Sequence, residues 1–187
     1  MKNSLEIIQL SKVYNSKEAV KNISFTISKN EIIGILGPNG CGKTTTIGMI
    51  LGLLKPSRGK VLINGIEIES KRVEILEKIN FISPYIELPK KLTVKQNLEV
   101  YGRLYDVKNL KSKIKYLSEE LRLNEFINKI TGELSSGQKN RVSLAKSIIN
   151  DPEVLLLDEP TASLDPETGD FVRSFLEKYQ KDRGASI

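Results

Sequence analysis

One short glycine-rich stretch constrains the fold of this chain more than any other feature. Residues 31–36, EIIGIL, have the composition of a buried strand, and they run directly into GPNGCGKT at 37–44. This octet matches the pattern G-x-x-x-x-G-K-[ST], whose glycines let successive backbone N–H groups point into one concavity. The next helix adds the positive end of its dipole. The stretch therefore predicts a phosphate-binding turn between a strand and a helix.

The side chains at the end of the loop fit the same chemistry. Lys43 supplies a mobile positive charge for the β- and γ-phosphates of a nucleotide, and the Thr44 hydroxyl can be a ligand of Mg²⁺. Apolar residues continue on one side of the predicted helix, at Ile47, Ile50 and Leu54.

Predicted strands occupy both ends of the chain around a mainly helical middle. The strand segments are LEIIQL, NISFTIS, EIIGIL, a hairpin KVLINGIEI around Asn64-Gly65, INFIS and EVLLLDEP. After GPNGCGKT, the helical segments are a polar helix near 71–78, TVKQNLEVYGRLY opened by Thr93, LKSKIKYLSEELRL, SSGQKNRVSLAKSII, and ETGDFVRSFLEKYQKD ending at Gly184. This order predicts an α/β core that carries a helical subdomain.

Composition narrows the class of protein. With 28% charged residues and no apolar run near eighteen residues, a transmembrane helix is not expected, and the N-terminus does not have the pattern of a secretory signal. The net charge of +6 is spread along the chain and aromatic residues make up 6%, so we expect no nucleic-acid partner. One cysteine and no histidine argue against disulfides and zinc, so a metal ion would be held by oxygens. The expected location is the cytoplasm.

Two further motifs gain meaning from their order. VLLLDEP at 154–160 predicts a buried strand that delivers Asp158 to the Mg²⁺ shell and Glu159 to the attacking water. LSSGQ at 134–138 precedes a basic helix, and Ser and Gly at a helix N-terminus can form an anion site. Each of these two is weak alone, but they follow the phosphate-binding loop in a fixed order.

Together these stretches resemble the ATP-binding-cassette family of P-loop ATPases over nearly the whole chain. Residues 37–44 are similar to its Walker A loop, 154–159 to its Walker B strand, 134–138 to its signature motif, and SLDP at 163–166 to its D-loop. The resemblance implies a P-loop NTPase (RecA-like) core with an N-terminal antiparallel β subdomain and a helical subdomain insertion. It also implies one domain over 1–187, with a core at 1–83 and 150–187 and a helical subdomain at about 84–149.

The resemblance also assigns site residues, with ATP and Mg²⁺ as cofactors. Glu159 would be catalytic, Thr44 and Asp158 would hold the metal, and Asp165 would act in the D-loop. The residues that would bind ATP are Tyr14, whose ring would stack on adenine, with Gly37, Pro38, Asn39, Gly40, Cys41, Gly42, Lys43, Thr44 and Thr45. The residues that would contact the ATP of a partner subunit are Leu134, Ser135, Ser136, Gly137 and Gln138.

In this family two cassettes sandwich the nucleotide, so the resemblance implies a second ATPase subunit, expected to be a homodimer partner, and an integral membrane permease subunit. The chain would be peripheral on the cytoplasmic face of the membrane, with the exposed part of 84–105 as the expected permease contact. We expect an ABC exporter that couples cassette dimerisation to transport. Two alternatives stay open: a soluble cassette ATPase of translation or DNA repair, and a regulatory module that binds nucleotide without hydrolysing it.

Three departures from the family pattern are visible. Pro84 falls at or next to the place of a Mg²⁺-binding Gln, and Ser136 replaces the commonest Gly of the signature. The family's switch histidine is missing, and the chain stops at ASI, where the strand that carries it would begin. We therefore expect a chain that is truncated at the C-terminus, whose 187 residues alone hydrolyse ATP poorly.

Overall fold

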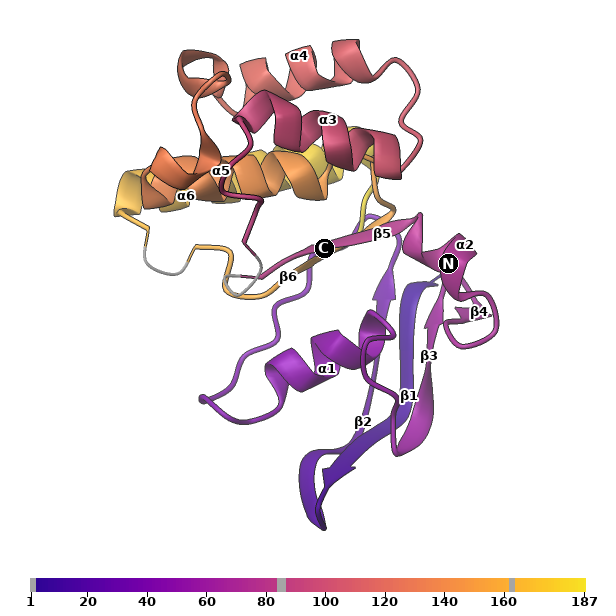
Figure 1. Cartoon of the computed structure of the whole chain (residues 1–187). Helices are drawn as coiled ribbons and strands as arrows, with labels where there is room; N and C mark the ends of the chain where they lie inside the picture. Colours follow the sequence, from indigo (N-terminus) through magenta and orange to yellow (C-terminus); the bar gives the residue numbers. More distant parts are fainter. Residues whose placement is uncertain (1–2, 84–86, 162–163) are drawn as a thin grey trace.

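A four-stranded antiparallel sheet forms one end of the molecule in the computed structural model, which describes residues 3–83, 87–161 and 164–187 (Figure 1). Its strands, in the order β2-β1-β3-β4, are β1 (Asn3–Tyr14), β2 (Lys17–Ser28), β3 (Arg58–Ile63) and β4 (Ile66–Glu67). Asn64 and Gly65 both have positive φ, at 52° and 77°, as a two-residue hairpin turn of this twist requires. The predicted hairpin is therefore confirmed.

A second sheet links this end to the helices. It consists of the parallel strands β5 (Ile79–Ile82) and β6 (Val154–Leu157). Helix α1 (Lys43–Ile50) packs beside the antiparallel sheet, and the short helix α2 (Arg72–Leu76) leads into β5 (Figure 1).

The prediction of a strand at residues 31–36 is wrong. Ile33 N donates to Ile187 O at 2.8 Å and Ile187 N donates to Glu31 O at 2.9 Å, while Ser186 forms a parallel bridge with Val154. Residues 185–187 thus join the sheet between 31–33 and β6. Beyond Ile33, no backbone hydrogen bond ties 34–36 to a neighbour among the described residues, and the Leu36 side chain is 94% exposed. Residues 34–36 stay irregular because no strand of the described residues lies beside them to accept or donate backbone hydrogen bonds.

The other helices of the described residues gather on the other side of β5 and β6 (Figure 1). They are α3 (Val94–Leu104), α4 (Leu110–Glu120), α5 (Ser136–Ser147) and α6 (Pro166–Arg183), with the short 3₁₀ turns η1 (Asn124–Phe126) and η2 (Thr131–Glu133). As predicted, Thr93 caps α3: its Oγ1 accepts from Gln96 N at 3.1 Å, and Gln96 Oε1 accepts from Thr93 N at 2.9 Å. Gln96 therefore has a capping role. As predicted, Gly184 ends α6 in a left-handed conformation, with φ 64°.

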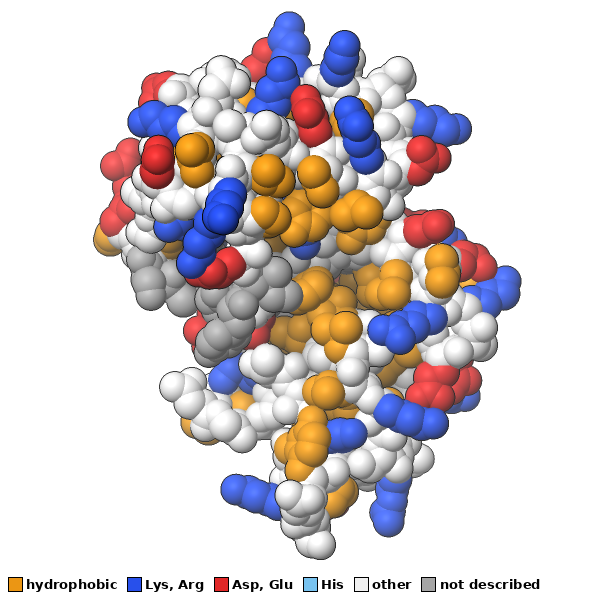
Figure 2. Space-filling model, viewed as in Figure 1, with side chains coloured by type: hydrophobic (Ala, Val, Ile, Leu, Met, Phe, Trp, Pro, Cys, Tyr) orange, Lys and Arg blue, Asp and Glu red, His pale blue; other side chains and the backbone are white. Residues whose placement is uncertain are grey.

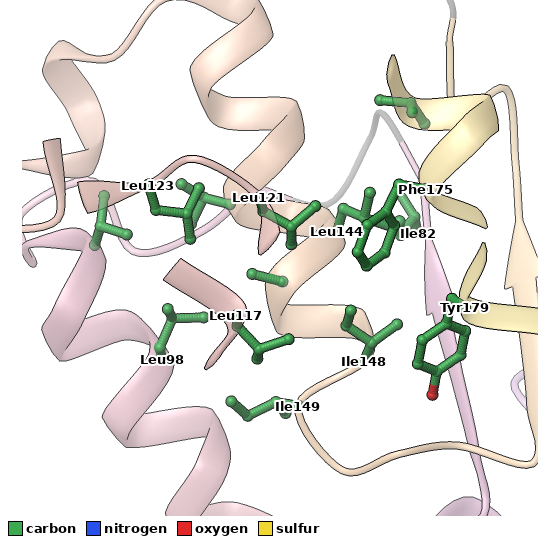
Figure 3. Packing of buried hydrophobic residues seen from close by; sticks show 14 of the residues in the cluster. Ile82, Leu98, Leu117, Leu121, Leu123, Leu144, Ile148, Ile149, Phe175 and Tyr179 are labelled. Carbon is green, nitrogen blue, oxygen red and sulfur yellow. The ribbon is translucent and has the colours of Figure 1, made fainter. Parts of the chain in front are cut away.

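Two hydrophobic clusters lie on opposite faces of the β5–β6 pair. The helical cluster includes Ile82 and Leu155 and is built mainly from helices α3 to α6 (Figure 3). The sheet cluster joins Val154 and Leu156 to the antiparallel sheet and α1. Successive residues of β6 belong to different clusters because side chains alternate across a strand. Within the described residues, no helix is both long and apolar enough to cross a bilayer.

Candidate nucleotide-binding site

Backbone conformation explains the glycines of the loop at 37–44. Gly40 and Gly42 have φ values of 80° and 97°, which side-chain-bearing residues rarely adopt. A Cβ on Gly42 would also lie 2.5 Å from the carbonyl oxygen of Ala19 and 2.9 Å from Cγ2 of Val20, both on β2. Gly42 is the N-cap of α1, so the close approach to β2 fixes where the positive end of this helix lies.

The lysine of the loop folds back onto the loop itself. Lys43 Nζ donates to the carbonyl oxygens of Gly37 at 2.7 Å and Pro38 at 3.0 Å. These bonds hold the positive charge at the start of the turn. A phosphate group in the turn would therefore meet this charge without a large movement of the side chain.

The two predicted metal ligands lie together although they are far apart in the sequence. Thr44 Oγ1 donates to Asp158 Oδ2 at 3.2 Å across a separation of 114 residues. Asp158 follows the last residue of β6 and is buried, with 5% of its surface exposed. A hydroxyl and a carboxylate are oxygen ligands of the kind that Mg²⁺ prefers. The described residues contain no cluster of three or more acidic, Cys or His side chains, so waters and phosphate oxygens would complete an Mg²⁺ shell here.

Glu159 follows Asp158 directly and is solvent-exposed. Its φ of 50° is in the left-handed region, where a non-glycine residue is uncommon. This conformation turns the chain sharply after β6. Glu159 lines two cavities, of about 510 Å³ beside residues 32–37 and of about 260 Å³ beside the start of α5. A carboxylate at this position can accept a proton from a water molecule that enters either space.

The signature segment begins a capped helix. Ser135 Oγ accepts from Gln138 N at 3.3 Å, and Gln138 Oε1 accepts from Ser135 N at 3.0 Å. Ser136 lines the 260 Å³ cavity with Glu159, whereas Lys43 lines other cavities.

One residue of this region was not predicted from the sequence. Asn140 on α5 donates from Nδ2 to the carbonyl oxygen of Pro160 at 2.8 Å, which ties the signature helix to the segment after Glu159. The sequence carried no signal for this bond, because a polar residue on a partly exposed helix is ordinary.

Asp165 has a structural role that the sequence reasoning did not include. It is the N-cap of α6, and its Oδ1 accepts from Thr168 N at 2.9 Å. Hydrogen bonds from Thr168 hold the pKa of Asp165 below its ordinary value. Pro84, which falls at or next to the place of the family's Gln, and Ser163 of the SLDP segment lie outside the described residues.

Tyr14 and Cys41, both expected to bind ATP, are solvent-exposed. Tyr14 ends β1 opposite Lys17, is 44% exposed, and has Lys12 Nζ at 5.0 Å from its ring centroid. A cavity of about 520 Å³ is lined by residues of β2 and of the loop, among them Cys41 and Lys43, but not by Tyr14. Cys41 is an exposed free thiol. Within this single chain, no described contact brings Tyr14 to the phosphate-binding loop.

The sequence of this chain is similar to known proteins of one family. The ABC transporter family model matches residues 20–162. The ABC transporter ATP-binding protein NatA of Bacillus subtilis is 34% identical over 89% of this chain and 69% of its own length. The Nod factor export ATP-binding protein I of Rhizobium johnstonii is 41% identical over 87% of this chain and 53% of its own length. The chain thus spans about half to two thirds of these curated relatives.

Solved structures of ATP-binding subunits have the same fold as this chain. CbiO1 of Clostridium perfringens, part of the transporter complex cbiONQ, superposes with a TM-score of 0.86 at 30% identity, over 100% of this chain and 77% of its own. The ATP-binding cassette MJ0796, solved as a dimer in a post-hydrolysis state with ADP and Pi, gives 0.88 at 27% identity, over 98% and 85%. The predicted fold class is confirmed by these structures. With a family model that covers most of it and relatives above 30% identity, the chain belongs to the ABC transporter family.

Proposed function

We propose that this chain binds ATP with Mg²⁺ and hydrolyses it, as the ATPase subunit of a membrane exporter. The observation that carries the proposal is the bond of Thr44 to Asp158, which joins the phosphate-binding loop to the end of β6 beside Glu159. The loop N–H groups and Lys43 would bind the phosphates, and Glu159 would orient the attacking water and accept its proton. Bound Mg²⁺ would neutralise charge on the β- and γ-phosphate oxygens.

We further propose that a second cassette, most simply a copy of this chain, completes the site. Residues 134–138 would contact the nucleotide held by the partner, with Asp165 near the junction. The support is that Ser136 and Lys43 line separate cavities, so one chain does not enclose a nucleotide with both. MJ0796 was solved as a dimer, which supports the same arrangement. ATP would then favour the closed pair, because its γ-phosphate contacts both subunits only in that state.

The partner and the direction of transport are inferred from relatives. The Nod factor protein is named for export, and CbiO1 is part of a multi-subunit transporter complex. We infer that this chain, with its core at 1–83 and 150–187, acts at the cytoplasmic face of a membrane on an integral permease subunit. The exposed part of 84–105, within the helical residues 84–149, would carry the contact.

The test measures the affinity of the chain for a fluorescent ATP analogue, with and without Mg²⁺. Replacing Thr44 with Val is expected to weaken Mg²⁺-dependent binding about tenfold or more, because the hydroxyl that ligates the ion and bonds Asp158 is lost. Binding without Mg²⁺ should change little. The matched control is Thr26→Val on the exposed surface of β2, which should bind like the unmodified chain. Equal Mg²⁺ dependence in both variants would contradict the proposal.

A further inference from the structure

Glu159 has a backbone conformation that the local sequence disfavours for two reasons. Its φ of 50° is left-handed, and the residue directly precedes Pro160. A proline ring clashes with the residue before it and drives that residue towards extended conformations. Such a conformation persists only where the surrounding structure holds it in place. The turn after β6 therefore needs partners outside its own sequence.

Hydrogen bonds on both sides of Glu159 hold this turn. Before it, Asp158 N donates to the carbonyl oxygen of Ile82 at 2.9 Å, which continues the parallel pairing of β5 with β6. After it, Asn140 Nδ2 donates to the carbonyl oxygen of Pro160 at 2.8 Å. The first bond belongs to the sheet, whereas the second comes from one side chain of α5. Glu159 thus lies between two fixed points, and the second of them depends on a single residue.

The helix that carries Asn140 is anchored in the core. Helix α5 buries Val142, Leu144 and Ala145 in the helical cluster, so it cannot shift without disturbing close-packed side chains. Figure 2 shows that the surface is hollowed between the helices and the antiparallel sheet with α1. In the same view in Figure 1, the segment after β6 runs below α5. The bond from Asn140 therefore ties this segment to a part of the molecule that is held by packing.

We propose that Asn140 is a positioning residue for the general base: by holding the carbonyl group of Pro160, it fixes the turn that orients the Glu159 carboxylate towards the attacking water. This inference rests on the proposed function, in which Glu159 accepts the proton of that water. All three residues line the cavity of about 260 Å³, so the turn and the side chain that holds it face one space. Without the bond, the turn would relax towards the extended conformation that a following proline favours.

The role of Asn140 concerns hydrolysis and not the binding of ATP. Asn140 lines neither cavity beside the phosphate-binding loop, and it takes no part in the bonds of Lys43 and Thr44. The signature segment also keeps its geometry without Asn140, because its capping bonds join Ser135 to Gln138. Loss of the Asn140 amide should therefore slow the chemical step while the affinity for ATP is kept.

The experiment measures ATP affinity and phosphate release by the assembled transporter that carries Asn140→Ala. Alanine favours the helix and removes the donor. We expect kcat to fall about tenfold or more, because misplacing a reacting group by about 1 Å is enough for such a loss. KM for ATP should change by less than about twofold. The control is Asn128→Ala, the same change at an exposed position, which should hydrolyse ATP like the unmodified protein.

A second measurement separates positioning from a general loss of structure. Asn140→Ala is combined with Glu159→Gln, and the slow residual hydrolysis is followed in a single turnover with the protein in excess over ATP. If Asn140 acts only through the Glu159 carboxylate, the double variant should hydrolyse ATP at the rate of Glu159→Gln within about twofold. A structural defect would instead lower the rate by the same factor with either residue at position 159.

The possible failures can be told apart. Equal rates for Asn140→Ala and Asn128→Ala, or an equal loss in both backgrounds, would overturn the positioning role and leave the proposed function standing. If Glu159→Gln hydrolyses ATP as fast as the unmodified protein, the proposed role of Glu159 falls, and the role of Asn140 falls with it. Asn140→Leu, which also lacks the donor, is measured in the same way. If neither variant folds, Asn140 is a residue of the fold, and the proposal is contradicted.

Discussion

Replacing Glu159 with Gln is expected to slow ATP hydrolysis about 10²- to 10⁴-fold, the usual contribution of a general base, while ATP binding is retained. The amide keeps the size of the side chain and can still bond a water molecule, but it cannot accept the proton of that water. Binding should persist because Glu159 is exposed and has no part in the contacts of Lys43 or Thr44. Steady-state phosphate release and nucleotide titration, run on the assembled transporter, give the two quantities.

The matched control is Glu177→Gln on the exposed face of α6, which removes the same charge far from the loop in sequence. Its rate should equal that of the unmodified protein. If Glu159→Gln hydrolyses ATP as fast as the control, Glu159 is not the base. If the unmodified protein binds ATP and releases no phosphate, the regulatory alternative is favoured over the enzyme.

Replacing Gly42 with Ala is expected to have the largest effect on stability in the loop, lowering the free energy of unfolding by about 3 kcal/mol or more. Two costs add: the left-handed φ of 97°, and a Cβ placed 2.5 Å from the backbone oxygen of Ala19. Since the contact is with backbone, the loop or β2 must move. Either movement displaces the start of α1 and its N–H groups, so ATP binding should be lost as well.

Gly34→Ala is the control for this substitution. Gly34 precedes the same loop, but its φ is not in the left-handed region and a Cβ there would meet no atom within 4 Å. Urea unfolding and ATP titration of both variants test the expectation. A Gly42→Ala protein as stable as Gly34→Ala would show that the close packing of the loop on β2 does not exist in solution.

The parts of the site that could be predicted are those that depend on short contiguous motifs and on the order of the strands. The loop at 37–44 needs glycines whatever lies around it, and the ends of parallel strands meet at one edge, so Thr44 and Asp158 could be expected to lie together. Whether residues 31–36 form a strand could not be predicted from the local sequence. Its composition is that of a strand, but hydrogen bonding depends on a neighbour, and the described neighbour reaches only Ile33.

The unpredicted contacts come from tertiary packing. The bond from Asn140 to Pro160 joins two exposed-looking segments and leaves no mark in the sequence. Lys146 on α5, whose Nζ lies 5.2 Å from the ring centroid of Tyr101 and 5.5 Å from that of Phe81, did leave a mark. It follows the buried Val142 by one helical turn and stands between the buried Ala145 and Ser147, so a charge falls at the margin of an apolar helix face. Helical spacing identifies this anomaly, although the two aromatic rings beside it are visible only in three dimensions.

The alternation of β6 between the two hydrophobic clusters has a consequence for cooperativity. Leu155 packs with the helices, while Val154 and Leu156 pack with the antiparallel sheet and α1. Unfolding of either the helices or the antiparallel sheet with α1 would expose one apolar face of β5 and β6 to water. The two parts should therefore unfold as one unit. Amide exchange should accordingly be slowest in β5 and β6, at a free energy equal to that of global unfolding. Faster exchange there than in α3 would mean that the two parts unfold separately.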